Sequence, residues 1–318
     1  MIRKHRFLIQ VLFLAMFLSC HTMAWADLHE VRVERGERKT SLGDLVTYRL
    51  YIPVPKPTLP PPPWPAVVLT HGFGRTHKYH SRNALYMARR GLVVLTPDMT
   101  SLTLGPRAQS RNVSNMVDHL VWLKNRGEDD QDGLKGLIDL ERMGLAGHSA
   151  GGAVSFEATL KGQAQRLPVA ALCLLDAVPW ERTVRRASSL RPLAFASIRS
   201  EESPCNFQGK VLDLLDRLTF PTEDVQIVGA RHCDAENPTS PPCWLLCGRS
   251  NDERQDLYQR LMYLFFRDAL GAALIENEPE TYQSSLEMLE SQGVVLRLPQ
   301  HQKRGPSVVD LPSRDTRK

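Results

Sequence analysis

The chain has 318 residues, enough for one large α/β domain with a buried core or for two small domains. Hydrophobic residues make up 42% of the chain and charged residues 24%, which excludes wholesale disorder. The formal net charge is +5, but three of the basic residues lie within the first six positions. The rest of the chain therefore carries a charge of only about +2 and shows no basic stripe interleaved with aromatic residues, so no nucleic-acid partner is expected.

Residues 1–26 have the pattern of a secretory signal peptide. A basic start at Arg3, Lys4 and Arg6 precedes the apolar run "FLIQVLFLAMFLS", and the small-x-small motif Ala24-Trp25-Ala26 follows. This pattern predicts cleavage after Ala26 and a secreted or periplasmic protein. The apolar run is shorter than the roughly 20 residues of a membrane span, so no stable span is expected after cleavage. The alternatives are an uncleaved N-terminal anchor or a lipid attached to Cys20.

The next segments predict a hairpin followed by alternating strands and helices. Two strand-like segments, 29–36 and 45–54, precede a proline-rich connector at 55–65. Short apolar runs that predict buried strands then alternate with helical segments. The predicted strands are 66–70, 92–98, 143–149, 169–179, 192–200 and 224–232, and the predicted helices are 80–91, 112–127, 150–162 and 253–270.

Together these segments predict an α/β fold with a mostly parallel central sheet and helices on both faces. One domain over residues 27–282 accounts for the pattern. Residues 283–318 are polar and basic with three prolines, and they are expected to form a tail that packs little or is disordered.

Gly147-His148-Ser149-Ala150-Gly151 is a G-x-S-x-G motif between a predicted strand and a predicted helix. This context places the serine on a sharp, strained turn, where neighbours two positions away must be glycine to avoid a clash. The N-terminal N–H groups of the following helix favour negative charge developing near the serine. Ser149 is therefore the predicted nucleophile.

A serine nucleophile needs a base and an acid that orients the base, in the chain order Ser, acid, His on this fold. His232 directly follows the last predicted strand and is the expected base. Asp176 ends the strand after the nucleophile helix and is the preferred acid, because a carboxylate there suits a buried partner of an imidazole. Glu201 and Glu202, after the next strand, stay open as alternative acids.

An oxyanion hole needs two backbone donors. The N–H of Ala150 is one, and the second is expected from the loop His71-Gly72-Phe73-Gly74, with Phe73 preferred. His71 is expected to brace this loop. The Phe73 ring, His148 and Trp180 are expected to line the substrate cleft.

The segments "HGFGR", "GHSAGG", "LLDAVPW" and "GARHCD" resemble the α/β-hydrolase superfamily. More narrowly, the chain resembles chlorophyllase and dienelactone-hydrolase-like esterases, with the cutinase-like polyester hydrolases as cousins. In chlorophyllases a "GHSRGG" serine, an "IDPV" aspartate and an "AGHLD"-type histidine form the triad, and the matching positions are Ser149, Asp176 and His232. The chain has "DAV" in place of "DPV" and Ala150 in place of a basic residue.

The resemblance implies an exported serine hydrolase that cleaves small or lipid-like carboxylic esters through an acyl-enzyme. The alternatives are an amidase or peptidase on the same triad, or a non-catalytic binding protein of the same fold. Neither a cofactor motif nor a metal cluster is recognisable, and neither a cofactor nor a metal is expected.

Five cysteines lie beyond the leader, and their odd number leaves at least one free thiol. Cys173 lies in an apolar strand and is the expected buried free thiol. Cys205 lies in the segment Ser203–Asn206 and Cys233 lies beside the expected base, so a disulfide that joins these two expected active-site loops is a hypothesis. Cys243 and Cys247 are close together in the sequence.

Overall fold

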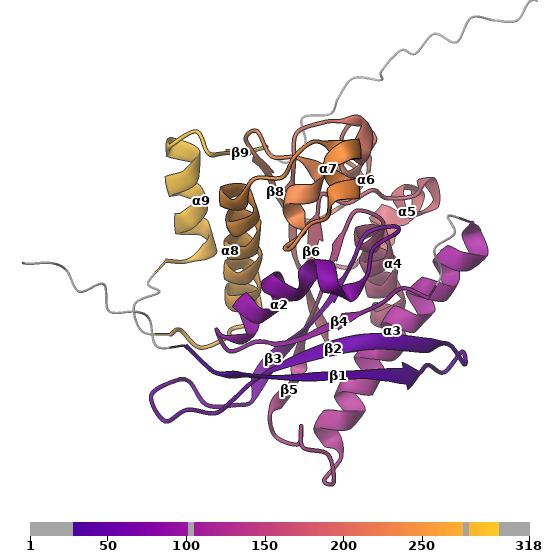
Figure 1. The fold of residues 1–318 in the computed structure, drawn as a ribbon. Coiled ribbons are helices and arrows are strands. Elements are labelled where there is room, and N and C mark those ends of the chain that lie inside the picture. Colours follow the sequence, from indigo (N-terminus) through magenta and orange to yellow (C-terminus); the bar gives the residue numbers. More distant parts are fainter. Residues whose placement is uncertain (1–27, 101–104, 276–279, 299–318) are drawn as a thin grey trace, which may run out of the picture.

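One twisted sheet runs through the protein (Figure 1). The computed structural model describes residues 28–100, 105–275 and 280–298. Within these residues the sheet has nine strands in the order β1-β2-β4-β3-β5-β6-β7-β8-β9. The strands are β1 (Val31–Lys39), β2 (Leu45–Pro53), β3 (Trp64–Thr70), β4 (Val93–Pro97), β5 (Ile138–His148), β6 (Val169–Leu175), β7 (Ala194–Arg199), β8 (Glu223–Ile227) and β9 (Val295–Arg297).

The six neighbouring strands from β4 to β8 are parallel, whereas β1, β2 and β9 pair antiparallel with their neighbours. The parallel strands are short and apolar because both of their faces are covered. On β5, for example, Leu145 contributes to the core on one face and Ala146 to the core on the other. The predicted hairpin and the predicted mostly parallel sheet are both confirmed.

Helices cover the two faces of the sheet, as Figure 1 shows. Apolar side chains of four helices belong to the core on one face, and those of three helices to the core on the other. The first group is α3 (Pro106–Glu128), α4 (Ala150–Ala164), α5 (Glu181–Arg186) and α6 (Val211–Leu215), and the second is α2 (Ser81–Ala88), α8 (Asp252–Ala269) and α9 (Tyr282–Ser291). A further short helix, α7 (Pro241–Cys247), lies between β8 and α8 in the chain.

The prediction that residues 283–318 form a tail that packs little is wrong for residues 283–297. Residues 282–297 form α9 and β9, and β9 pairs with β8 at the edge of the sheet. Leu286 and Leu289 on α9 and Val295 on β9 are buried. These few apolar residues are enough to attach a mostly polar segment to the core, so the folded domain extends past residue 282.

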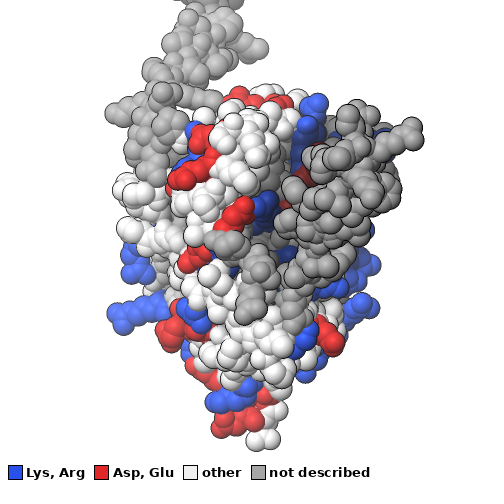
Figure 2. Space-filling view, turned by 90° about the vertical axis from the view of Figure 1, so that its left-hand side faces the viewer, with Lys and Arg blue, Asp and Glu red and all other residues white. Residues whose placement is uncertain are grey.

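Charged side chains of both signs are interspersed on the face that carries α8 and α9 (Figure 2). A mixed surface of this kind agrees with the low net charge of the chain beyond its first 26 residues. Across the ranges that the structure describes, none of the helices combines the length and the apolar character that crossing a membrane requires. The predicted signal peptide, Cys20 and residues 299–318 lie outside the described residues.

Candidate active site

Ser149 lies at the turn between β5 and α4, where the parallel sheet meets the start of a helix. Its backbone has φ 55° and ψ −123°, a conformation that costs a non-glycine residue about 1–3 kcal/mol. Two hydrogen bonds to the end of β6 and the loop after it hold this conformation: Ser149 N–H donates to Leu175 C=O at 3.1 Å, and Val178 N–H donates to Ser149 C=O at 3.0 Å. The surrounding structure therefore maintains a strained serine at the carboxyl end of the sheet.

The two glycines of the motif are required by close backbone contacts. A Cβ on Gly147 would lie 2.2 Å from the carbonyl oxygen of Gly151, and a Cβ on Gly151 would lie 2.3 Å from the carbonyl oxygen of His71. Backbone atoms cannot yield as a flexible side chain can. The turn consequently admits only glycine at both positions, as the sequence motif predicts.

Asp176 and His232 form a buried hydrogen-bonded pair. His232 Nδ1 lies 2.5 Å from Asp176 Oδ2. A carboxylate oxygen only accepts, so Nδ1 carries the proton and Nε2 of the neutral ring is left as the acceptor. Asp176 follows β6 directly, and its backbone also has a positive φ of 42°. The structure thus joins the preferred acid and the expected base, which lie 56 positions apart in the chain.

The Asp176 carboxylate has further donors that sequence reasoning missed. Ser200 donates from its backbone N–H to Oδ1 at 3.0 Å and from its hydroxyl to Oδ2 at 2.8 Å. Asn206 Nδ2 lies 3.3 Å from Oδ1. Ser200 directly follows β7, the strand beside β6, and its place at that parallel strand end is the signal that could have revealed it.

The two alternative acids lie elsewhere. The Glu201 carboxylate accepts a hydrogen bond from Gly229 N–H at 2.7 Å, and Glu202 is exposed. Among the described residues, Asp176 is the carboxylate that is hydrogen-bonded to the His232 ring. This geometry favours Asp176 over Glu201 and Glu202.

The loop after β3 passes close to the serine. A Cβ built on Gly72 would lie 3.2 Å from Ser149 Cβ, so the absence of a side chain lets the loop approach the serine without displacing it. His71 braces the loop: its Nε2 accepts from Met99 N–H at 2.9 Å, which leaves Nδ1 to donate to Gly72 C=O at 2.8 Å. Burial lowers the pKa of His71 and keeps the ring neutral for this role. Ala150 is the first residue of α4, where backbone N–H groups have no partner within the helix.

A cavity of about 570 Å³ opens beside Ser149. Ser149, His232, Phe73, His148 and Trp180 all lie on its wall, as does Ala150. The other lining residues are mostly apolar, and they include Val178, Pro179, Phe207, Leu246 and the disulfide-bonded Cys205 and Cys247. The residues expected to line the cleft are therefore brought together around the serine.

His148, Glu236 and Arg75 form a second polar group beside His232. His148 Nε2 donates to the backbone carbonyl of His232 at 2.9 Å, and the two rings lie 4.6 Å apart between centroids. Burial, and then the neighbouring His232, lower the pKa of His148 well below its usual value, so this ring is neutral. On its other side His148 Nδ1 lies 3.6 Å from Glu236 Oε1, and Glu236 is ion-paired with Arg75 at 2.8 Å. His148 thus contacts the residue expected to act as base as well as the cavity.

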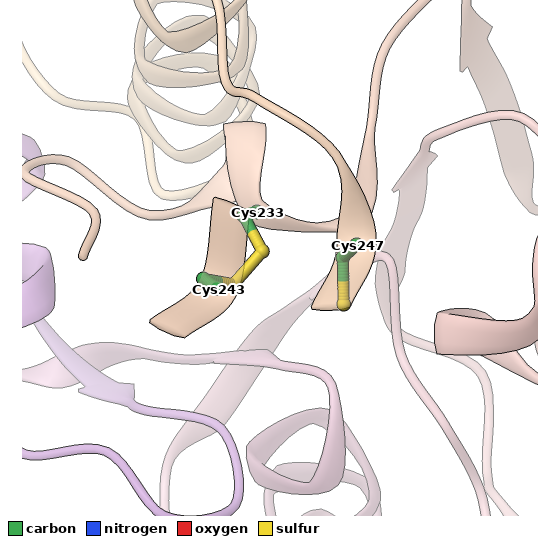
Figure 3. Close-up of side chains that lie close together, drawn as sticks. All are labelled: Cys233, Cys243 and Cys247. Atoms are coloured by element: carbon green, nitrogen blue, oxygen red, sulfur yellow. A yellow bond between two sulfur atoms is a disulfide. The ribbon is translucent and has the colours of Figure 1, made fainter. Parts of the chain in front are cut away.

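The disulfide hypothesis is wrong in its pairing. Cys205 is bonded to Cys247 and Cys233 to Cys243, so both loops are joined to α7 rather than to each other. Figure 3 shows Cys233, Cys243 and Cys247 close together, and their sulfur atoms lie within 4.8 Å of one another. Because these sulfurs form disulfides, they are not thiolate ligands for a metal. Cys173 is free and buried, as expected.

The sheet order, the strained serine between β5 and α4 and the acid–histidine pair at the ends of neighbouring strands define a protein of the α/β-hydrolase fold. The family described as Chlorophyllase matches residues 31–192, about half of the chain, and the chain belongs to this family. The match includes Phe73, Ser149 and Asp176, whereas His232 lies beyond it. Comparison with the curated proteins gives no match. Family membership places the chain among the carboxylic-ester hydrolases in general.

Proposed function

We propose that the protein is a serine hydrolase that cleaves carboxylic esters through Ser149, His232 and Asp176. The observation that carries the proposal is the hydrogen bond between His232 Nδ1 and Asp176 Oδ2, in a structure where Ser149 and His232 line one cavity. A buried carboxylate that holds Nδ1–H directs the basic Nε2 of the ring away from itself. The strained turn presents the serine hydroxyl to the same cavity.

In the proposed reaction the Ser149 hydroxyl oxygen attacks the ester carbonyl carbon while His232 Nε2 takes the hydroxyl proton. The carbonyl oxygen becomes an oxyanion, which accepts hydrogen bonds from the N–H groups of Phe73 and Ala150. His232 then returns the proton to the leaving alcohol, and an acyl-enzyme remains on Ser149. Water repeats the sequence with His232 as base, which releases the carboxylic acid and restores the serine.

The cavity wall supports a substrate with an apolar group on at least one side of the ester. Val178, Pro179 and Trp180 follow Asp176 in the chain and form one apolar part of the wall, and the Phe73 ring forms another. A wall of this kind gains free energy by burying hydrocarbon, about 0.8 kcal/mol for each CH₂ group. We therefore propose a lipid-like or other apolar ester as substrate, with His148 and Trp180 among the residues that contact it.

Two measurements test the activity. Purified protein is incubated with p-nitrophenyl esters from acetate to palmitate and, separately, with a fluorophosphonate probe, and the wild type is compared with Ser149→Ala. We expect turnover and labelling in the wild type and neither in the variant. Ser110→Ala, an exposed serine on α3, is the matched control and should behave as the wild type. Equal turnover in wild type and Ser149→Ala would refute the proposed nucleophile, and faster cleavage of the matching anilides would indicate an amidase.

We also propose that the protein is exported, with its leader removed after Ala26. Two disulfides in the folded domain support this proposal, because disulfides persist in oxidising compartments. Mass spectrometry of the protein isolated from its producing cells should find Asp27 as the first residue. A chain beginning at Met1 would instead indicate an uncleaved anchor, and a lipid-modified Cys20 would indicate a lipoprotein.

A further inference from the structure

Large apolar side chains are exposed around the mouth of the candidate active-site cavity. Phe73, Phe207 and Leu246 line the cavity, yet these residues are 50%, 68% and 81% exposed. Leu245, beside Leu246 on α7, is 87% exposed, and its neighbour Trp244 is also exposed. We call these five residues the apolar rim. Single exposed apolar residues are ordinary, but a contiguous group at a binding site marks an interaction surface.

The disulfides fix which side of α7 faces water. Cys243 and Cys247 are four positions apart on the helix, so their side chains lie on the same face, and both are bonded to the loops beneath. Leu245 is two positions from each cysteine and therefore lies on the opposite face. Because two covalent bonds anchor this short helix, Leu245 cannot turn inward to bury itself. The exposure of the leucines is thus built into the fold.

Two segments that carry the rim, the turn before Phe207 and α7, adjoin one another, and the loop with Phe73 lines the same cavity. The Sγ atom of Cys205 lies 3.5 Å from the carbonyl oxygen of Leu246, which brings the 3₁₀ turn Pro204–Asn206 against α7. Phe207 directly follows this turn. Phe73, Phe207 and Leu246 thus belong both to the cavity wall and to the surface outside it. Hydrocarbon that extends out of the cavity would therefore lie on the rim.

From these observations we propose that the apolar rim docks the protein onto the apolar surface of aggregated ester substrate, such as a micelle, a droplet or a bilayer. The inference rests on the proposed function and specifies how the substrate is presented. When the rim lies on such a surface, Leu245 and its neighbours leave water, and an ester chain reaches Ser149 along a continuous apolar path. Removing one fully buried leucine from such a contact weakens binding about tenfold or more.

The test measures binding without catalysis. Ser149→Ala protein is sedimented with neutral phosphatidylcholine vesicles, and its partition coefficient is compared with that of Ser149→Ala/Leu245→Asp. The matched control is Ser149→Ala/Leu274→Asp. Leu274 is 59% exposed and follows α8, whose end is hydrogen-bonded to Arg142 on the amino-terminal half of β5, away from the serine end of that strand. We expect the Leu245→Asp change to lower partitioning at least about tenfold and the Leu274→Asp change to have no effect.

Turnover of soluble p-nitrophenyl acetate by Leu245→Asp is measured alongside and should equal that of the wild type, because Leu245 does not line the cavity. The inference is overturned if Ser149→Ala protein does not sediment with vesicles, or if the two leucine variants partition equally. It is also overturned if sedimentation velocity shows a dimer that Leu245→Asp dissociates, since the rim would then be an interface between two copies. A wild type without turnover would refute the proposed function, whereas the vesicle assay would still report on docking.

Discussion

Replacing Asp176 with asparagine tests the proposed triad at the point where its geometry is clearest. Asparagine keeps the size of aspartate but offers one acceptor oxygen and one NH₂ donor. Ser200 N–H can only donate, so it holds the amide oxygen at the Oδ1 position. The NH₂ group then stands at the Oδ2 position, facing His232 Nδ1. There it can only donate, which forces the imidazole proton onto Nε2.

The proton on Nε2 removes the acceptor that Ser149 needs. In a Ser-His-Asp triad the same replacement lowers kcat about 10⁴-fold, and we expect a loss of that size, equivalent to about 5 kcal/mol of transition-state stabilisation. The fold should lose less, about 1.5–3 kcal/mol, which is typical for a hydrogen bond to a charged group. Activity should therefore fall far more than stability.

The assay is kcat/KM for p-nitrophenyl butyrate, with urea unfolding of each variant measured in parallel. Glu201→Gln is the matched control, because its amide oxygen can still accept from Gly229 N–H. We expect this control, and Glu202→Gln, to stay within about threefold of the wild type. The reasoning is refuted if Asp176→Asn keeps more than a tenth of wild-type activity, or if either glutamate variant loses as much as Asp176→Asn does.

Three further perturbations test the glycine turn, a buried histidine and a disulfide. Gly147→Ala should lower Tm by at least about 6 °C, because its Cβ would lie 2.2 Å from a backbone oxygen, whereas Gly133→Ala, whose Cβ would meet only the flexible end of Arg32 at 3.8 Å, should not. Calorimetry showing equal Tm values would contradict this account of the turn. Burial lowers the pKa of His80 from 6.5 to about 3, so its neutral form stabilises the fold fully above pH 6.5 and this contribution is lost as the pH falls toward 3. The unfolding free energy of the wild type between pH 6 and 4 should therefore fall by about 1.4 kcal/mol per pH unit more than that of His80→Gln, and parallel pH profiles in urea would argue against it. The double variant Cys205→Ser/Cys247→Ser opens a loop with a sequence separation of 42 and should lose about 4 kcal/mol of unfolding free energy, a prediction that fails if its urea midpoint equals that of the wild type.

The parallel sheet could be predicted because its signals are local and repeated. Each buried strand is a short apolar run, and a turn separates the run from the helical segment that follows it. The Ser149 turn was predictable for the same reason, since the steric demand that selects Gly147 and Gly151 acts within five consecutive residues. The chain order of Ser149, Asp176 and His232 then followed from the topology of the fold.

The end of the domain was not predictable from average composition. Residues 283–318 are polar as a whole, and this average concealed Leu286 and Leu289, which lie three positions apart on one face of α9. A strand of three residues, β9, gives almost no periodic signal. It exists because the edge of β8 offers unpaired backbone groups, which is a property of the assembled sheet.

The disulfide pairing was missed because loop–helix distances depend on tertiary structure. The hypothesis named two loops that do form disulfides, those of Cys205 and Cys233. It omitted α7, which carries their partners Cys247 and Cys243. The observed pairing also affects the acid and the base. Cys205 precedes Asn206, which donates to Asp176, and Cys233 directly follows His232. Each disulfide therefore ties α7 to one half of the acid–base pair. The helix that exposes Leu245 also holds the proposed acid and base in place, so docking of the apolar rim would act on a rigid element that is already joined to the chemistry.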